Sequence, residues 1–238
     1  RNWASSYSGL VVAGSCRAFL LPAHRKINWL PRQTELMPSD PLPREFYDRD
    51  PTTVARQLLG KTMHRRSRRG LTSGTIVEVE AYLSKTDSAS HAFRGRTGRN
   101  AAMFGPPGHL YVYSIHSRYC LNAVTESSET ASAVLIRALE PLAGITVMQA
   151  RRERLALVDL ARGPARLCEA LDVDRDLDGW DLTCGSRIWI DNASALPARS
   201  FRTGKSKRIG VTSACEARLR FFVDGSRFVS GLRRDHSK

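Results

Sequence analysis

The chain lacks the patterns by which several common functions are recognised. None of its five cysteines (Cys16, Cys120, Cys168, Cys184 and Cys215) forms a C-x-x-C pair, which argues against a zinc finger or a disulfide framework. It has neither a P-loop nor a G-x-G-x-x-G motif, which argues against nucleotide hydrolysis and hydride transfer. The apolar run at residues 9–14 is too short to span a bilayer, and no convincing cleavage site follows it. We therefore expect reduced thiols, a cytoplasmic location and no membrane contact.

Acidic residues are few in relation to basic ones. Lys and Arg total 37 against 23 Asp and Glu, which gives a net charge of +14. Such an excess attracts polyanions, of which nucleic acid is the usual one, although a generic basic surface is the plain alternative. An anionic membrane is a weaker rival, because no long amphipathic basic helix is evident. With 238 residues, 42% of them hydrophobic, the chain suits one sizeable globular domain.

The first part of the chain differs in composition from the rest. Residues 1–42 mix Ser, Arg and Pro with isolated aromatics and run into the proline-rich stretch 37–43, which favours an extended linker. We expect an N-terminal extension over residues 1–42 that is poorly ordered or loosely docked. A domain is expected over residues 43–230, followed by a C-terminal tail at 231–238.

The domain is expected to mix helices and strands. Helices are predicted over residues 50–60, 141–154 and 163–171, and strands over 61–65, 75–83, 110–115, 131–139, 188–190, 208–211 and 219–223. The basic turn at residues 66–70 is either a phosphate contact or a solvated hairpin tip. Because the elements follow one another without regular βαβ periodicity, the pattern favours an α+β fold over a doubly wound sheet.

The strand at residues 75–83 is the most informative element. Its alternation is typical of a half-buried strand, with Val77 and Val79 on one face and Glu78, Glu80 and Tyr82 on the other. Two carboxylates and a phenol therefore line one side of a rigid element. Carboxylates so held are well placed to activate a water.

A charge inside another apolar strand needs a partner. Arg137 lies between Leu135–Ile136 and Ala138–Leu139, and an unpaired buried charge is costly. Glu80 and Glu140 are the candidate partners. Such a pair is either structural or orients a carboxylate that holds a nucleophilic water, and the residues alone leave both possibilities open.

Aromatic side chains accompany the carboxylates and the basic loop at residues 84–99. They are Tyr82, His91, Tyr111, Tyr113 and Tyr119. Aromatic faces beside basic residues can hold a base that has left its stack, but tyrosines on a strand are as readily core residues. A metal site built from Glu78, Glu80, Asp87 and His91 is a lesser possibility, because the spacing matches no tight metal motif.

Several segments together resemble the alkyladenine (3-methyladenine, methylpurine) DNA glycosylase family. They are Ile76–Tyr82 with His91 nine residues on, Arg99–Phe104, Gly108–Tyr113, Val134–Pro141, Gly163–Leu167 and Arg208–Val211. Each segment alone is weakly specific, but the ordered set is specific and covers roughly residues 44–230. The resemblance implies a single α+β domain with a curved, mainly antiparallel sheet flanked by helices and a basic face for double-stranded DNA.

The resemblance also implies an activity. A monofunctional, nucleoid-associated bacterial enzyme would flip an alkylated or deaminated purine out of the duplex and hydrolyse its N-glycosidic bond, as a monomer, with no metal and no organic cofactor. Glu80 falls on the family's general base, Arg137 on a residue that positions the water, and the backbone carbonyl of Val211 on a third contact. The residues expected to bind the base are Tyr82, His91, Tyr113, Asn122 and Leu135.

One segment departs from the vertebrate-type pattern of the family. Between Tyr113 and Asn122 the chain is one residue shorter, and the side chain that wedges into the duplex is expected to be Ile115 or His116. A non-catalytic protein that binds damaged DNA is the alternative function, and a metal-dependent nuclease is a third.

Overall fold

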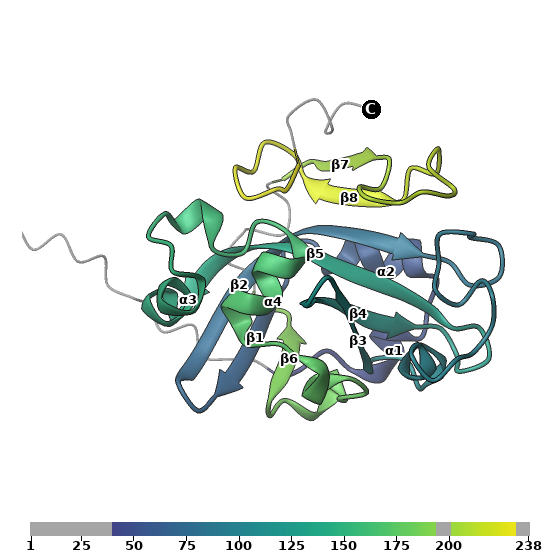
Figure 1. The fold of residues 1–238 in the computed structure, drawn as a ribbon, viewed down its shortest axis with the longest axis horizontal. Coiled ribbons are helices and arrows are strands. Elements are labelled where there is room, and N and C mark those ends of the chain that lie inside the picture. Colours follow the sequence, from purple (N-terminus) through teal and green to yellow (C-terminus); the bar gives the residue numbers. More distant parts are fainter. Residues whose placement is uncertain (1–39, 194–200, 232–238) are drawn as a thin grey trace, which may run out of the picture. The chain divides into compact units, whose positions relative to one another are not determined.

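One antiparallel sheet organises the part of the chain that the computed structural model describes, residues 40–193 and 201–231 (Figure 1). Its strands are β1 (Thr62–Ser67), β2 (Gly70–Tyr82), β3 (Leu110–Ile115), β4 (Arg118–Thr125), β5 (Ser132–Ala143), β6 (Ile188–Asp191), β7 (Thr203–Ser206) and β8 (Arg220–Val223). The helices are α1 (Arg44–Tyr47), α2 (Pro51–Leu58), α3 (Ile145–Arg152) and α4 (Pro164–Leu171). Short 3-10 turns are η1 (Ala101–Phe104), η2 (Leu157–Asp159), η3 (Arg175–Leu177) and η4 (Leu182–Cys184).

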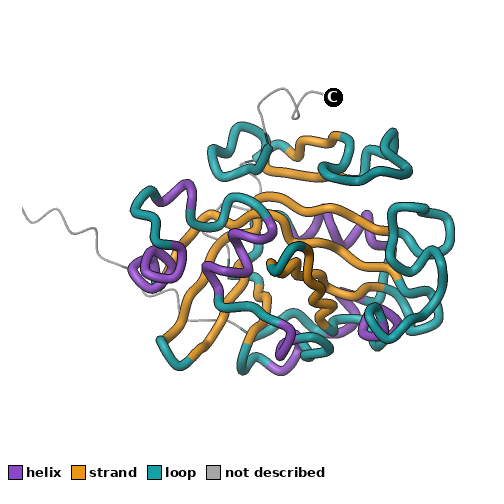
Figure 2. Tube along the Cα trace, in the orientation of Figure 1, coloured by secondary structure: helices purple, strands orange, loops and turns teal. Residues whose placement is uncertain are grey.

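The strand order makes β2 the centre of the sheet. The strands lie in the order β3-β4-β5-β2-β1-β6, and all of these pairings are antiparallel. The first half of β2 pairs with β1, whereas its second half, Glu78 to Glu80, pairs with β8, which pairs in turn with β7. Figure 2 shows these long strands with helices and loops around them. The predicted α+β class with a curved, mainly antiparallel sheet is confirmed.

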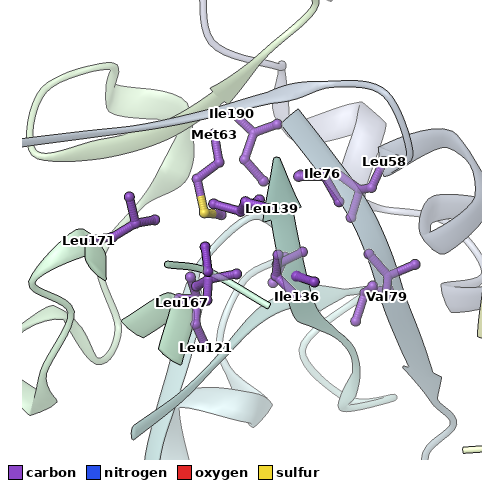
Figure 3. Packing of buried hydrophobic residues seen from close by; sticks show 14 of the residues in the cluster. Leu58, Met63, Ile76, Val79, Leu121, Ile136, Leu139, Leu167, Leu171 and Ile190 are labelled. Atoms are coloured by element: carbon purple, nitrogen blue, oxygen red, sulfur yellow. The ribbon is translucent and has the colours of Figure 1, made fainter. Parts of the chain in front are cut away.

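The core packs helices α2 and α4 against the sheet. Leu58 of α2, Leu167 of α4 and Ile76, Ile136 and Leu139 of the two long strands are all fully buried (Figure 3). Asp50 caps α2 by accepting a hydrogen bond from the Thr53 N–H at 2.9 Å, and Pro51 occupies its first turn. The helix at 50–60 was thus predicted correctly, apart from its last two residues.

The prediction that β2 is half-buried is wrong. Every residue from Ile76 to Ala81 is at most 1% exposed, so both faces of the strand are covered. The alternation itself holds, because Glu78 and Glu80 both contact Arg137 and therefore share a face. The cover on that face comes from residues 206–230, which lie far along the chain and which a local pattern does not reveal.

Two predicted elements differ from the structure, and one strand, β4, was not predicted. The helix expected over 141–154 begins only at Ile145, because β5 continues to Ala143 and Gly144 turns the chain with a φ of +67°. Residues 208–211, predicted as a strand, form a loop, and the strand of that region is β7. The stretch after Ile115 folds back as β4, so that residues 110–125 form a hairpin.

The expected N-terminal extension lies almost wholly outside the described residues, and so does the tail from residue 232. The few described residues before the domain are held against it. Pro41 pairs with Asp191, and the Leu42 N–H donates to the Ile190 carbonyl at 2.8 Å. Four cysteines (Cys120, Cys168, Cys184 and Cys215) are free, as expected, whereas Cys16 lies outside the described residues. Within the described ranges no helix has the length and apolar character needed to cross a membrane.

Candidate active site

A cavity of about 1030 Å³ lies between the end of β2, the loop that follows it, the β3–β4 hairpin and the loop after β7. Its aromatic lining consists of Tyr82, His91, Tyr111, Tyr113 and Tyr119. Asn122, Ile115 and Val211 also face it, together with the three arginines Arg94, Arg99 and Arg175. The β-sheet thus brings together most of the residues that the sequence proposed, from segments up to 130 residues apart.

Glu80 lies next to this cavity and is fully buried. Its Oε1 accepts a hydrogen bond from the Ile209 N–H at 2.8 Å, and its Oε2 accepts one from the Tyr82 hydroxyl at 2.9 Å. Arg137 Nη1 lies 3.1 Å from the same Oε2. Two of these partners connect the carboxylate to the cavity, because Tyr82 lines it and Ile209 lies two residues before Val211.

Glu78, two residues earlier on β2, is held differently. Its Oε1 accepts from Arg137 Nε at 3.0 Å, from Arg220 Nε at 2.7 Å and from the Ser230 hydroxyl at 2.9 Å. Its Oε2 accepts from the Ser230 N–H at 2.7 Å. Burial by itself would raise the pKa of Glu78, but the charges of Arg137 and Arg220 outweigh it and hold that pKa below its ordinary value.

Arg137 joins the two carboxylates. It pairs with Glu78 and Glu80, so the candidate partner Glu80 is correct and the candidate partner Glu140 is wrong. Glu140 lies opposite Thr75 in the sheet register, three positions along β2 from the Glu78–Ala138 pair. Burial would lower the pKa of Arg137, but Glu80 and Glu78 raise it above its ordinary value, so the guanidinium remains charged.

A second buried ion pair holds the loop that covers Glu80. Arg208 donates to both carboxylate oxygens of Asp87, at 2.6 and 2.7 Å, and to the Ala81 carbonyl at 3.1 Å. Its guanidinium carbon lies 4.6 Å from the centre of the Tyr82 ring. This pair therefore fixes both Tyr82 and the backbone that brings the Ile209 N–H to Glu80.

Three aromatic rings form a cluster on one side of the cavity. The rings of His91 and Tyr113 meet edge to face with centroids 4.6 Å apart, and Tyr111 stacks on Tyr113 at 5.3 Å. His91 Nδ1 is hydrogen-bonded to the Tyr111 hydroxyl at 2.8 Å. Burial lowers the pKa of His91, so the imidazole is uncharged at neutral pH. Burial, with a smaller effect of Asp178, raises the pKa of Tyr111 to about 12.

The remaining base-binding candidates have different surroundings. Asn122 is buried on β4, lines the cavity, and donates from Nδ2 to the Tyr111 carbonyl at 2.9 Å. Leu135 lies opposite both Glu80 and Asn122 in the sheet register and is buried, but it is not among the described residues that line the cavity. A contact between Leu135 and a base therefore stays a prediction.

The two wedge candidates are found at the tip of the β3–β4 hairpin. Ile115 is 47% exposed, although it is a large apolar residue, and it lines the cavity. His116 and Ser117 form the turn, with φ of 46° and 60°. Left-handed backbone at both central positions is typical of the tight turns that match the twist of a hairpin. The turn thus presents Ile115 at the mouth of the cavity.

The proposed metal ligands are not brought together. Glu78 and Glu80 are held by Arg137, Asp87 by Arg208, and His91 by Tyr111. Over the described ranges, no group of three or more His, Cys, Asp or Glu side chains is arranged to hold a metal ion.

Some residues of the site were missed by the sequence reasoning. Tyr111 was named among the candidate aromatic residues but not assigned to the base, although it lies two positions before Tyr113 on one strand and so shares its face. Arg220 lies within an apolar strand, as Arg137 does, and the same argument from buried charge would have found it. No local pattern indicates the Ile209 N–H or Ser230, because their roles depend on where distant loops are placed.

The family model described as methylpurine-DNA glycosylase (MPG) matches residues 45–227, and the chain belongs to this family of DNA glycosylases. A protein of Rhodopirellula baltica is 48% identical to it over 202 residues, which is 83% of this chain and 86% of that relative. A protein of Koribacter versatilis is 46% identical over 200 residues, 81% of this chain and 94% of that relative. Both relatives bear the name "Putative 3-methyladenine DNA glycosylase". The family resemblance found in the motifs is thus confirmed.

Proposed function

We propose that this chain is a monofunctional DNA glycosylase of base-excision repair that excises alkylated or deaminated purines, of the 3-methyladenine, 7-methylguanine and hypoxanthine class, from duplex DNA. The observation that carries the proposal is the position of Glu80. It is a fully buried carboxylate bound to Arg137 and to the hydroxyl of Tyr82, which lines an aromatic cavity. Family membership supplies DNA as the substrate.

The flipped base lies, in this proposal, between Tyr82 on one side and the His91–Tyr113 pair on the other. The 4.6 Å contact between His91 and Tyr113 supports a continuous wall made of two rings. An alkylated purine carries positive charge, and aromatic faces attract a cation. The uncharged state of His91 supports the same choice of ligand, because a protonated imidazole would repel that charge.

The bond is hydrolysed by a water that attacks C1′ of the deoxyribose. Glu80 takes a proton from that water, the N-glycosidic bond breaks, and its electron pair leaves with the purine. For an alkylated purine the departing base becomes neutral, and the products are the free base and an abasic sugar. Arg137 positions Glu80, and the carbonyl of Val211 is the proposed second contact of the water. The lining of the cavity, as far as it is described, contains no lysine, which supports a reaction without a Schiff base.

Selectivity and base flipping are assigned to two further residues. Asn122 is held by its bond to the Tyr111 carbonyl and faces the cavity, so it is suited to oppose the exocyclic amino group of normal guanine. Ile115 is the preferred wedge, because an exposed apolar side chain next to the cavity can unstack a base step. The enzyme is proposed to act as a monomer.

The test is a product assay on duplex oligonucleotides that each contain one lesion, with EDTA present. We expect release of free 3-methyladenine, 7-methylguanine or hypoxanthine and no strand cleavage before alkali is added. Strand cleavage that EDTA abolishes would instead indicate a nuclease.

A non-catalytic protein that binds damaged DNA is the second candidate. One observation favours it: both Glu80 oxygens already accept hydrogen bonds and the side chain is fully buried, so a water can reach it only after some movement. This candidate predicts tight, salt-sensitive binding to the duplex without base release.

A further inference from the structure

Six arginines gather where β1 turns into β2, at the opposite end of the long strand from the cavity. They are Arg65, Arg66, Arg68, Arg69, Arg151 and Arg187. The fold brings them together from three separate segments. The Arg66 N–H donates to the Arg187 carbonyl at 2.8 Å, and Arg151 Nη2 donates to the Ser67 hydroxyl at 2.8 Å.

Two of the six are mainly structural and make the hairpin rigid. Arg65 is 7% exposed and donates to the carbonyls of Arg66 and Asp172, at 2.6 and 3.2 Å. The side chain of Arg151 is 6% exposed and binds the Ala170 carbonyl at 2.9 Å as well as Ser67. The hairpin tip is therefore fastened to α3, α4 and the segment before β6.

The other four arginines, Arg66, Arg68, Arg69 and Arg187, are exposed. None of them forms an ion pair with another residue of the described ranges, and the nearby Asp172 pairs with Arg151 at 3.4 Å. The positive charges also act on one another. Burial chiefly lowers the pKa of Arg65; the charge of Asp172 raises it, whereas the charges of Arg187 and Arg151 lower it. A cluster that repels itself in this way is relieved by an anionic ligand.

Two of the exposed guanidinium groups rest on aromatic rings. The Arg66 group lies 5.2 Å from the Trp189 ring centre, and the Arg187 group lies 5.0 Å from that of Trp180. Stacking limits the freedom of a planar guanidinium, so less entropy is lost when it binds an anion. Arginine is also the side chain whose donor geometry best matches a phosphate.

A ligand that contacts both the arginine cluster and the cavity must span the distance between them. β2 has 13 residues from Gly70 at the hairpin to Tyr82 at the cavity, and at about 3.3 Å per residue this is roughly 40 Å. None of the six arginines lines the cavity. Along B-DNA the same distance corresponds to about 12 base pairs, at 3.4 Å per pair.

We propose that these arginines are a second contact site for the phosphates of duplex DNA, independent of base sequence and separate from the cavity. The phosphates belong either to the duplex whose base is in the cavity or to a second duplex segment. This second site rests only on the binding of DNA, which belongs to the family. It does not depend on the lesion specificity or on the role of Glu80 proposed above.

The test uses the full-length chain and a triple variant of exposed residues, Arg66→Gln, Arg68→Gln and Arg69→Gln. Binding of undamaged 12-base-pair and 40-base-pair duplexes is measured by fluorescence anisotropy over a range of salt concentrations. We expect the variant to bind the 40-base-pair duplex at least tenfold more weakly. The slope of log K against log salt should fall by about 2 to 3, since each lost phosphate contact changes it by about 0.9. Single-turnover base release from a 12-base-pair lesion duplex should stay within twofold of wild type.

A charge-matched control separates a local contact from a general loss of positive charge. The variant Arg56→Gln, Arg166→Gln, Arg227→Gln removes three exposed arginines that lie elsewhere on the domain. If both triple variants bind the 40-base-pair duplex equally well, the proposal is wrong, and the ligand of the cluster is another anion, such as an acidic protein.

The number of duplexes bound per chain distinguishes the two sources of the phosphates. If wild type binds two 12-base-pair duplexes per chain and the Arg66, Arg68 and Arg69 variant binds one, the phosphates belong to a second duplex segment. If wild type binds DNA but releases no base, the proposed function is wrong. The comparison of duplex binding between wild type and the two triple variants still tests the second site in that case.

Discussion

Glu78 and Glu80 share one strand, one face and one arginine, and both are fully buried, yet their surroundings differ. Glu78 accepts four hydrogen bonds and lies between two guanidinium groups. Glu80 shares only Arg137, and its other partners are a backbone N–H and the Tyr82 hydroxyl, next to a cavity. Two carboxylates of similar burial thus differ in their partners: Glu78 balances charge inside the sheet, and Glu80 is the one that we propose as the base.

Replacing Glu80 should give the largest effect. Glu80→Gln keeps acceptor and donor atoms near Arg137 and Ile209 but removes the base, so we expect base release to fall by about 10² to 10⁴-fold. Single-turnover release from a lesion duplex measures this, with DNA binding as the reference. The matched control is Glu140→Gln, on β5 and half-buried, which should change the rate less than twofold. A Glu80→Gln enzyme as fast as wild type would remove the distinction between the two carboxylates.

Glu78→Gln should act on stability instead of rate. It removes the carboxylate that pairs with both Arg137 and Arg220, and breaking a buried pair in this way costs roughly 3 to 5 kcal/mol. Urea unfolding measures the loss as a lower midpoint at unchanged slope. Adding Arg220→Gln restores the charge balance. The free energy of unfolding that the double variant loses should therefore be smaller than the sum of the losses in the two single variants. If the losses simply add, charge balance is not what holds Glu78.

Tyr82→Phe tests the partner that only Glu80 has. The ring remains in the cavity wall, but the hydrogen bond to Glu80 Oε2 is lost, and we expect base release to fall about tenfold, or roughly 1.4 kcal/mol. Tyr119→Phe is the control, because Tyr119 also lines the cavity. Equal effects of the two changes would mean that the hydroxyl of Tyr82 has no special role.

The smallest effect is the pH dependence of stability. The pKa of Glu78 in the folded protein lies below its ordinary value of 4.5. The contribution of Glu78 to the free energy of unfolding is therefore complete above pH 4.5 and is lost as the pH falls through the lower pKa of the folded state. The stability difference between wild type and Glu78→Gln should therefore be constant from pH 6 to about 5 and should shrink below about 4.5. Unfolding curves at several pH values measure it; a difference that grows toward acid pH would contradict the sign of this shift.

Local patterns predicted the strands well and the partners poorly. The alternation around Glu80 correctly placed Glu78, Glu80 and Tyr82 on one face, because side-chain direction in a strand follows from its geometry alone. The same alternation suggested that this face is half-open, and it is closed instead. Whether a strand face is covered depends on pairings far along the chain, here those of β8 and of the loop before it.

Arg137 and the segment 208–211 illustrate the same limit. A charge in an apolar strand correctly indicated an ion pair with Glu80, but the second candidate, Glu140, is wrong, and the fold supplies Glu78 in its place. Residues 208–211 have the composition of a strand, yet Arg208 binds Asp87 and the Ile209 N–H binds Glu80, which keeps this segment in a loop. The family motifs assign roles to residues for which a local pattern gives no role, and those roles stay predictions.

The contacts that cover the two carboxylates also have a consequence for biosynthesis. Ile209 is 129 residues beyond Glu80, and Arg220 and Ser230 are 142 and 152 residues beyond Glu78. Contacts between such distant residues form late, since a long loop must close first. A nascent chain on the ribosome therefore carries its central strand with both carboxylates still hydrated. Both carboxylates become buried only when this segment has been synthesised and has docked onto the central strand.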